Sequence, residues 1–233
     1  MTHHFTHGAS LKSVRLTFTG LVSAFALTGC LTLPGLGVGV TGGTTGLGVE
    51  AKANPLPTGH VMIRGGVSYL DVGGDFDSDG VTYDGDVEVA NLNAVLDFSP
   101  TGGLFYISGG AYFGDKTVDL VATPMNNVDV GGVTFTPGEV GSLVGEVEYS
   151  DVSPYLGIAF DNFTNSVAGW SFNARAGVMF VGSPDITVNS VGGTLSSDAA
   201  LLNALNAEID SLEEDAEDYE FFPVVTLGVT RRF

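Results

Sequence analysis

Apolar and polar residues alternate along most of the chain beyond residue 35, with the period of two that is typical of β-strands. Turn-forming clusters of Gly, Pro, Asn, Ser and Thr separate the alternating segments. The start of the fourth segment, 87–89, has the opposite parity from the rest of that segment, which predicts a β-bulge. The pattern predicts eight strands, at 36–41, 47–53, 60–69, 87–98, 105–113, 154–160, 170–180 and 221–233.

The connectors between these segments alternate between short and long. Those around Pro55, Pro100 and Thr164 are short, whereas 71–86, 114–143 and 182–219 are long. Short turns on one rim, long loops on the other and strands of about ten residues are typical of membrane barrels. The sequence therefore predicts an all-β fold, an eight-stranded antiparallel transmembrane β-barrel with both termini in the periplasm. Parity alone does not say which face points outward, so a soluble lipocalin-like barrel with an apolar interior is the alternative.

One segment inside the last long connector has a helical period instead. Apolar residues recur at three- and four-residue steps from Leu201 to Ala216, and Ser197 or Asp198 is placed to cap the first turn. Acidic residues occupy the other face. We expect a short helix in the last external loop, ending near Asp218, that covers the barrel mouth. Exposure of its apolar stripe for a partner protein is the alternative.

The first thirty residues have the features of an export signal. Lys12 and Arg15 precede the apolar stretch 16–27, and small residues follow it. Residues 27–30 (LTGC) also resemble a bacterial lipobox, in which Cys30 is acylated and becomes the new amino terminus. The alternative is an ordinary signal that is cleaved after this cysteine. Residues 1–30 are therefore assigned to the signal and residues 31–233 to the barrel.

The charge of the chain is strongly acidic, with 8 Lys and Arg against 27 Asp and Glu and a formal net charge of −19. Nucleic acids and anionic inner-leaflet lipids bind clustered Lys and Arg, so this balance excludes both as partners. Beyond the amino terminus the sequence has no run of eighteen apolar residues, which argues against a transmembrane helix in the mature chain. A barrel needs only alternate apolar residues and remains compatible.

The carboxyl-terminal part of the chain carries a family resemblance. The last thirteen residues alternate and stop on the aromatic Phe233, as in the closing strand that the barrel-assembly machinery reads in outer-membrane barrels. The chain resembles small Gram-negative outer-membrane barrels of the ornithine-uptake porin type and opacity-like surface proteins. This resemblance implies an eight-stranded barrel and brings no catalytic residues. It rests on Gly138, Tyr155-Leu156-Gly157, Gly169-Trp170, Gly182-Ser183-Pro184, the acidic helical segment and Pro223-Val224.

Charged residues of both signs share the polar faces of the predicted strands. An eight-stranded barrel has an interior only just wide enough for its own side chains, so we expect these charges to pair into a lumen network. The alternative is a selective path for a zwitterionic solute, in which the arginines hold a carboxylate and Glu50 or Asp97 an amine. The set comprises Glu50, Lys52, Arg64, Asp97 and Arg175.

Residues 75–80 (DFDSDG) match the start of a calcium loop, with carboxylates at Asp75, Asp77 and Asp79 and a glycine for the turn. Asp86 occupies the twelfth position, where a Glu is usual, and flanking helices are not predicted. The alternative is a solvated acidic hairpin tip. If Ca²⁺ binds, it could bridge this loop to lipopolysaccharide phosphates.

These observations predict a protein of the outer membrane without enzymatic activity. We expect a narrow porin-like channel for small polar solutes or a structural surface protein. A binding or adhesion module that uses the acidic external loops is the alternative function. The expected partners are outer-membrane lipids, lipopolysaccharide and the barrel-assembly machinery.

Overall fold

The computed structural model describes residues 35–56, 59–78, 81–165, 169–216 and 220–233. The chain divides into two units, Met1–Leu33 and Pro34–Phe233, and the described residues all belong to the second. The predicted export signal and Cys30 lie outside the described residues.

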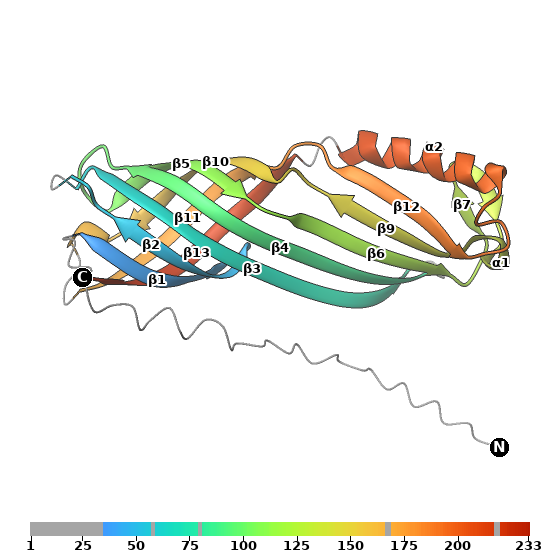
Figure 1. Cartoon of the computed structure of the whole chain (residues 1–233), viewed down its shortest axis with the longest axis horizontal. Helices are drawn as coiled ribbons and strands as arrows, with labels where there is room; N and C mark the ends of the chain where they lie inside the picture. Colours follow the sequence, from blue (N-terminus) through green and yellow to red (C-terminus); the bar gives the residue numbers. More distant parts are fainter. Residues whose placement is uncertain (1–34, 57–58, 79–80, 166–168, 217–219) are drawn as a thin grey trace, which may run out of the picture. The chain divides into compact units, whose positions relative to one another are not determined.

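Eight antiparallel strands close into a ring, as the alternation predicts (Figure 1). Each strand pairs with two neighbours in the order β1-β2-β3-β4-β5-β10-β11-β13, and β13 pairs back to β1. The backbone amide of Phe233 donates a hydrogen bond to the carbonyl of Leu36, so the two ends of the barrel chain meet. The ring strands are β1 (Leu36–Gly43), β2 (Gly46–Ala53), β3 (Val61–Ser78), β4 (Val81–Phe98), β5 (Phe105–Phe113), β10 (Val152–Asp161), β11 (Trp170–Phe180) and β13 (Phe221–Arg232).

The apolar face of the ring points outward. Leu227 and Phe172 on the exterior are 64% and 63% exposed, whereas Lys52 and Asp97 on the interior are 1% and 0% exposed. A soluble barrel in water would reverse this arrangement, because large apolar side chains gain free energy by leaving water. The lipocalin-like alternative is therefore wrong.

Aromatic side chains mark both rims of this exterior belt. Phe105 and Phe160 stack edge to face at 5.5 Å beside the short turns, and Phe180 and Phe221 do so at 5.4 Å at the opposite rim. Trp170 lies on the outer face near the short turns and is 49% exposed. Two aromatic girdles around an apolar band are typical of barrels that face lipid.

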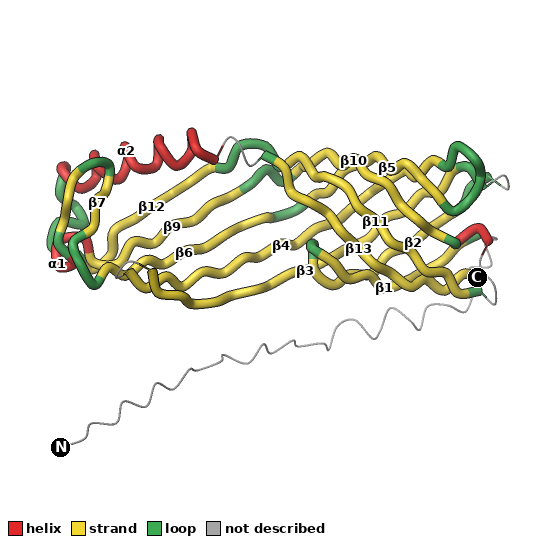
Figure 2. Tube along the Cα trace, turned by 180° about the vertical axis from the view of Figure 1, so that it is seen from behind, coloured by secondary structure: helices red, strands yellow, loops and turns green. Residues whose placement is uncertain are grey.

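The long connectors differ from the predicted loops, because much of their length forms strands. Beyond the ring, β3 and β4 continue as one long hairpin, and three further strands pair beside it. The result is a five-stranded sheet, called here the extension, with the order β12-β9-β6-β4-β3 (Figure 2). Its added strands are β6 (Lys116–Pro124), β9 (Gly141–Glu148) and β12 (Asp185–Gly192).

The predicted helix is present as α2 (Ala199–Ala216), and the carboxylate of Asp198 accepts the amide hydrogen of Ala200 at 2.8 Å. It contacts β12 and the small hairpin of β7 (Val128–Val130) and β8 (Val133–Phe135). Leu201 and Leu205 are 0% and 2% exposed in an apolar cluster with Val130 and Phe135. The helix therefore packs on the extension, which corrects the prediction that it covers the barrel mouth. The other helices in the described part of the chain are α1 (Pro137–Val140) and the 3₁₀ turn η2 (Phe163–Asn165).

Among the described residues, no helix is long and apolar enough to cross a membrane.

The predicted bulge at 87–89 is wrong, because β3 and β4 stay in one register from Val61 opposite Phe98 to Ser78 opposite Val81. The parity of hydrophobicity changes because the surroundings change. In the ring, outward residues such as Leu92 are apolar. In the extension, outward residues such as Glu88 are acidic, while Val87 and Val89 lie on the face that continues the lumen wall. The exterior is therefore apolar around the ring and suited to water around the extension.

Lys116 lies at the junction of the extension and the ring, where the strand is interrupted between β5 and β6 and again between β9 and β10. Gly114, with φ of 125°, separates β5 from β6, and Ser150 lies between β9 and β10. The Lys116 ammonium donates hydrogen bonds of 2.8 Å to the carbonyls of both residues. Burial lowers the pKa of Lys116, and the carboxylates of Asp151 and Asp115 oppose this shift. Lys116 thus connects the two strand interruptions through hydrogen bonds from one ammonium group.

Candidate functional site: the charged lumen

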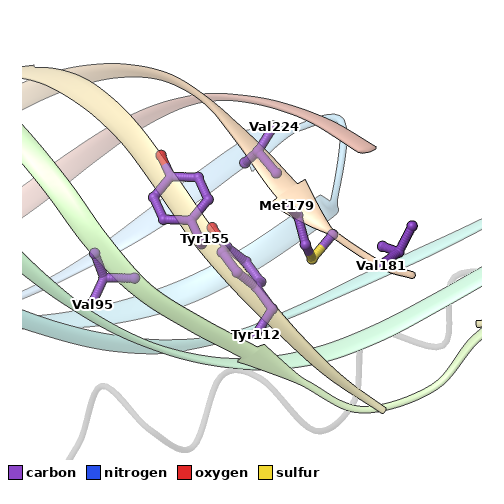
Figure 3. Close-up of a cluster of buried hydrophobic side chains, with 6 residues drawn as sticks. All are labelled: Val95, Tyr112, Tyr155, Met179, Val181 and Val224. Carbon is purple, nitrogen blue, oxygen red and sulfur yellow. The ribbon is translucent and has the colours of Figure 1, made fainter. Parts of the chain in front are cut away.

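The lumen is filled at three levels. Near the short turns, Met62, Tyr106, Ala159 and Phe163 form an apolar cluster that is at most 1% exposed. Toward the extension, a second cluster contains Tyr112 and Tyr155, whose rings meet edge to face at 5.4 Å (Figure 3). The charged side chains lie between these two clusters. The remaining members of the second cluster are Val95, Met179, Val181 and Val224.

Glu50 is the centre of the charged layer. Its carboxylate accepts two hydrogen bonds from the guanidinium of Arg175, at 2.8 and 2.6 Å, and a third from Arg64 at 3.4 Å. The Lys52 ammonium lies 3.6 Å from the same carboxylate. A bidentate arginine–carboxylate pair is among the strongest side-chain hydrogen-bond arrangements. Glu50 therefore joins strands β2, β3 and β11 across the lumen.

Two further carboxylates complete the layer. Asp97 accepts a hydrogen bond from Arg64 Nε at 2.8 Å and one from the Ser108 hydroxyl at 2.5 Å. Asp161, which the sequence interpretation missed, lies 2.5 Å from the Lys52 ammonium. It continues the inward alternation of β10 by one step beyond Ala159, and that continuation was the available signal.

The formal charges of this layer cancel. Its three cations, Lys52, Arg64 and Arg175, face its three anions, Glu50, Asp97 and Asp161, and their side chains are at most 4% exposed. An isolated charge at this depth would cost several kcal/mol, whereas a balanced and hydrogen-bonded set avoids most of that penalty. The structure thus brings all five predicted lumen residues together, and the layer closes the barrel as it stands.

Glycines on the lumen wall make room for the large rings that close the barrel. A Cβ at Gly37 would lie 2.4 Å from the ring of Phe163, and one at Gly177 would lie 2.6 Å from the ring of Tyr155. These distances are too short for a methyl group. Small residues on one wall therefore allow bulky residues on the other to fill the interior.

Several buried polar atoms beside the ion pairs have no hydrogen-bond partner among the described residues. They include Nη2 of Arg64, Nε of Arg175, and both side-chain amide atoms of Asn91 and Asn173. Buried polar groups are nearly always satisfied by protein, solvent or a ligand. The lumen wall therefore presents polar atoms that water or a polar solute would satisfy, in addition to the ion pairs. The other such atoms are Asn93 Oδ1, Ser68 Oγ and Ser171 Oγ.

The predicted calcium ligands lie away from the lumen. Asp75 and Asp77 stand side by side on β3, and Asp86 lies on β4 opposite Gly73, so these residues belong to paired strands. This is a correction to the predicted loop, because an extended hairpin does not curl its carboxylates around one ion. No group of three metal-ligating side chains is found in the described ranges. Asp79 lies outside the described residues.

Comparisons with known proteins support the fold. No protein-family model and no curated protein sequence matches the chain. Among solved structures, Acinetobacter baumannii CarO2 is similar with a TM-score of 0.60 and 21% identity, over 86% of this chain and 99% of that one. Acinetobacter baumannii CarO is similar with a TM-score of 0.57 and 24% identity, over 84% of this chain and 97% of that one. The chain therefore shares the fold of the CarO structures over nearly their whole length.

Proposed function

We propose that the chain is a porin-like barrel of a Gram-negative outer membrane. The exposed apolar belt carries this proposal, because only acyl chains would surround such a surface favourably. Lipids and lipopolysaccharide are the expected neighbours of the belt and its outer rim. The barrel-assembly machinery is expected to read the closing strand that ends at Phe233. Recovery in the outer-membrane fraction tests this assignment, and extraction by buffer alone would contradict it.

Within that membrane, we propose a narrow pathway for small polar solutes that opens by exchange of lumen ion pairs. The polar side chains of the lumen wall support the proposal, because the amides of Asn91 and Asn173 hydrogen-bond no protein group among the described residues and are available to water or to a solute. A zwitterionic solute carries both charges of a salt bridge. Its carboxylate can take the place of Glu50 beside an arginine, and its amine can take the place of that arginine beside Glu50. Neither exchange leaves a net charge in the lumen.

Single-channel recording in planar bilayers tests the pathway. We expect small, discrete openings from the native protein, and longer openings from Arg175→Met, which removes half of the bidentate pair. Gln substitution of exposed Glu88 is the matched control and should leave the openings unchanged. Silence from the native protein and from Arg175→Met would show that the lumen network is only a structural filling.

A surface-binding role is the second candidate, and the extension favours it. A purely structural barrel or channel does not require five strands that continue past the apolar belt. Tyr69 and Ala90 are Cα partners, so the hairpin 70–89 can be replaced by a two-residue turn between them. We expect this variant to keep its barrel and, as purified protein in micelles, to lose attachment to polylysine-coated glass. Unchanged attachment would argue against the binding role.

A further inference from the structure

The extension has one open edge among its described strands. β2 pairs with β3 only as far as Leu47 opposite Tyr69, so residues 70–78 of β3 pair with β4 on one side alone. Figure 1 shows this part of β3 at the margin of the sheet. The opposite margin, β12, is covered by α2, and the amide of Ile186 there donates to the carboxylate of Glu213 at 3.4 Å. The described structure thus protects β12 and leaves β3 open over about 30 Å.

The backbone groups on this open edge belong to odd-numbered residues. The amide of Ala90 donates to the carbonyl of Asp115, so even-numbered residues of β4 point toward β6 and odd-numbered ones toward β3. In the β3–β4 register, the odd residues of β4 face even residues of β3. Backbone groups alternate in direction along a strand. The N–H and C=O groups directed to the open side are therefore those of Asp71, Gly73, Asp75 and Asp77.

The two faces beside this edge have opposite chemistry. Asp71, Asp75 and Asp77 lie on the outer face, next to Asp84, Asp86 and Glu88 of β4. The inner face begins with Leu70 and Val72, and Val72 is 55% exposed. The sequence has no basic residue between Arg64 and Lys116. A strand added at this edge would therefore meet a face whose charged groups are all carboxylates and, on the other side, a face that begins with the apolar Leu70 and Val72.

We propose that the β3 edge is a docking site for an extended segment of another protein in which Lys or Arg alternates with apolar residues. Such a segment would extend the sheet in line with β2, with its basic residues on the acidic face and its apolar residues beside Val72. A second copy of this chain fits poorly, because it would bring Asp71, Asp75 and Asp77 against the same carboxylates. This inference rests on the surface-binding role, and names the partner chemistry for it.

The test uses the protein in detergent micelles and a synthetic nine-residue peptide with alternating Lys and Val. A peptide of the same composition, with its lysines in one block and its valines in another, is the matched control. We expect binding of the alternating peptide and at least about tenfold slower hydrogen exchange at the amides of Asp71, Gly73, Asp75 and Asp77. The even-numbered amides, which already face β4, should change little.

A matched pair of variants examines the backbone contact. Gly73→Pro removes an edge N–H without removing a bond to β4, and should weaken peptide binding about fivefold or more. Gly73→Ala keeps the N–H and should bind as the native protein does. An added Cβ at this position would lie 2.0 Å from Oδ1 of Asp86, so the exposed Asp86 carboxylate has to rotate away, while the Gly85 carbonyl stays at an ordinary contact distance of 3.6 Å. Heat-dependent gel mobility confirms that each variant forms a barrel; if the proline variant fails to fold, the amide pattern in the native protein decides.

Each result then separates the possibilities. Equal binding of the alternating and block peptides would overturn edge pairing while leaving a general acidic binding surface. No binding of either peptide would overturn the proposed partner chemistry. Slow exchange at the same amides in concentrated protein without peptide would identify a second copy as the occupant, and would also overturn the proposal. Channel openings do not depend on this edge and should be unchanged throughout.

Discussion

Substitution of Glu50 by Gln should destabilise the barrel far more than the same substitution at an exposed glutamate of the extension. Glu50 contacts three cations, and its bidentate pair with Arg175 has distances of 2.6 and 2.8 Å at 4% exposure. Removal of its charge leaves three cations against two anions in the lumen. Loss of one partner from a buried pair costs about 3–5 kcal/mol in the free energy of unfolding.

A double-mutant cycle tests whether Glu50 and Arg175 are energetically coupled. Arg175→Met in the Glu50→Gln background restores two cations against two anions, so the double variant should be more stable than Glu50→Gln alone. We expect a coupling energy of about 1–3 kcal/mol between the two positions. Urea unfolding in micelles can follow the fluorescence of Trp170, the single tryptophan. Glu88→Gln makes the same chemical change on the exposed extension and should shift stability by less than about 0.5 kcal/mol.

Unfolding of Glu50→Gln and Glu88→Gln at the same urea concentration would contradict a stabilising role for the charged layer. Simple addition of the effects of Glu50→Gln and Arg175→Met, without coupling, would show that the charged layer does not act as one network.

Three further changes probe other parts of the structure. Leu227→Lys on the apolar belt should cost about 2–4 kcal/mol in the free energy of unfolding in vesicles, and a small effect would place this face in water. Lys116→Met should speed hydrogen exchange of the backbone amides around Gly114 and Ser150, which the Lys116 ammonium connects. Unchanged exchange would show that Lys116 does not hold these two segments together. Hydrogen bonds from the backbone and hydroxyl of Thr136 lower the pKa of Glu139. The stabilisation of α1 by the Glu139 carboxylate should therefore be present at neutral pH and be lost as the pH falls through this lowered pKa. Hydrogen exchange at the amides of α1 measures this loss. Glu139→Gln should remove the pH dependence.

The alternation of apolar residues located all eight ring strands because each ring wall separates two different environments. An outward apolar side chain and an inward Gly or polar residue recur along every ring strand, and the signal is strong. The same rule placed Glu50 and Arg175 on the lumen side. It could not give their pairing, which depends on how the barrel closes.

The extension escaped prediction for the same physical reason. Beyond Tyr69 and Ala90 the outer face of the sheet is acidic and no longer apolar, so the apolar residues of β3 and β4 lie on the inner face instead. Val87 and Val89 then look like a bulge when they are read with Leu92. Glycine and aspartate around residues 73–77 added to the impression of a loop, because both are rare in buried strands.

The most direct test of the account compares two positions on one face of β4, Glu88 and Leu92. Residues 31–233, which lack Cys30, can be refolded into vesicles with a spin-labelled cysteine at either site. The account predicts that the label at 92 collides mainly with oxygen dissolved in the lipid, and the label at 88 mainly with a water-soluble nickel chelate. Equal access of the nickel chelate to both labels would contradict an apolar belt that faces lipid and ends between these two residues.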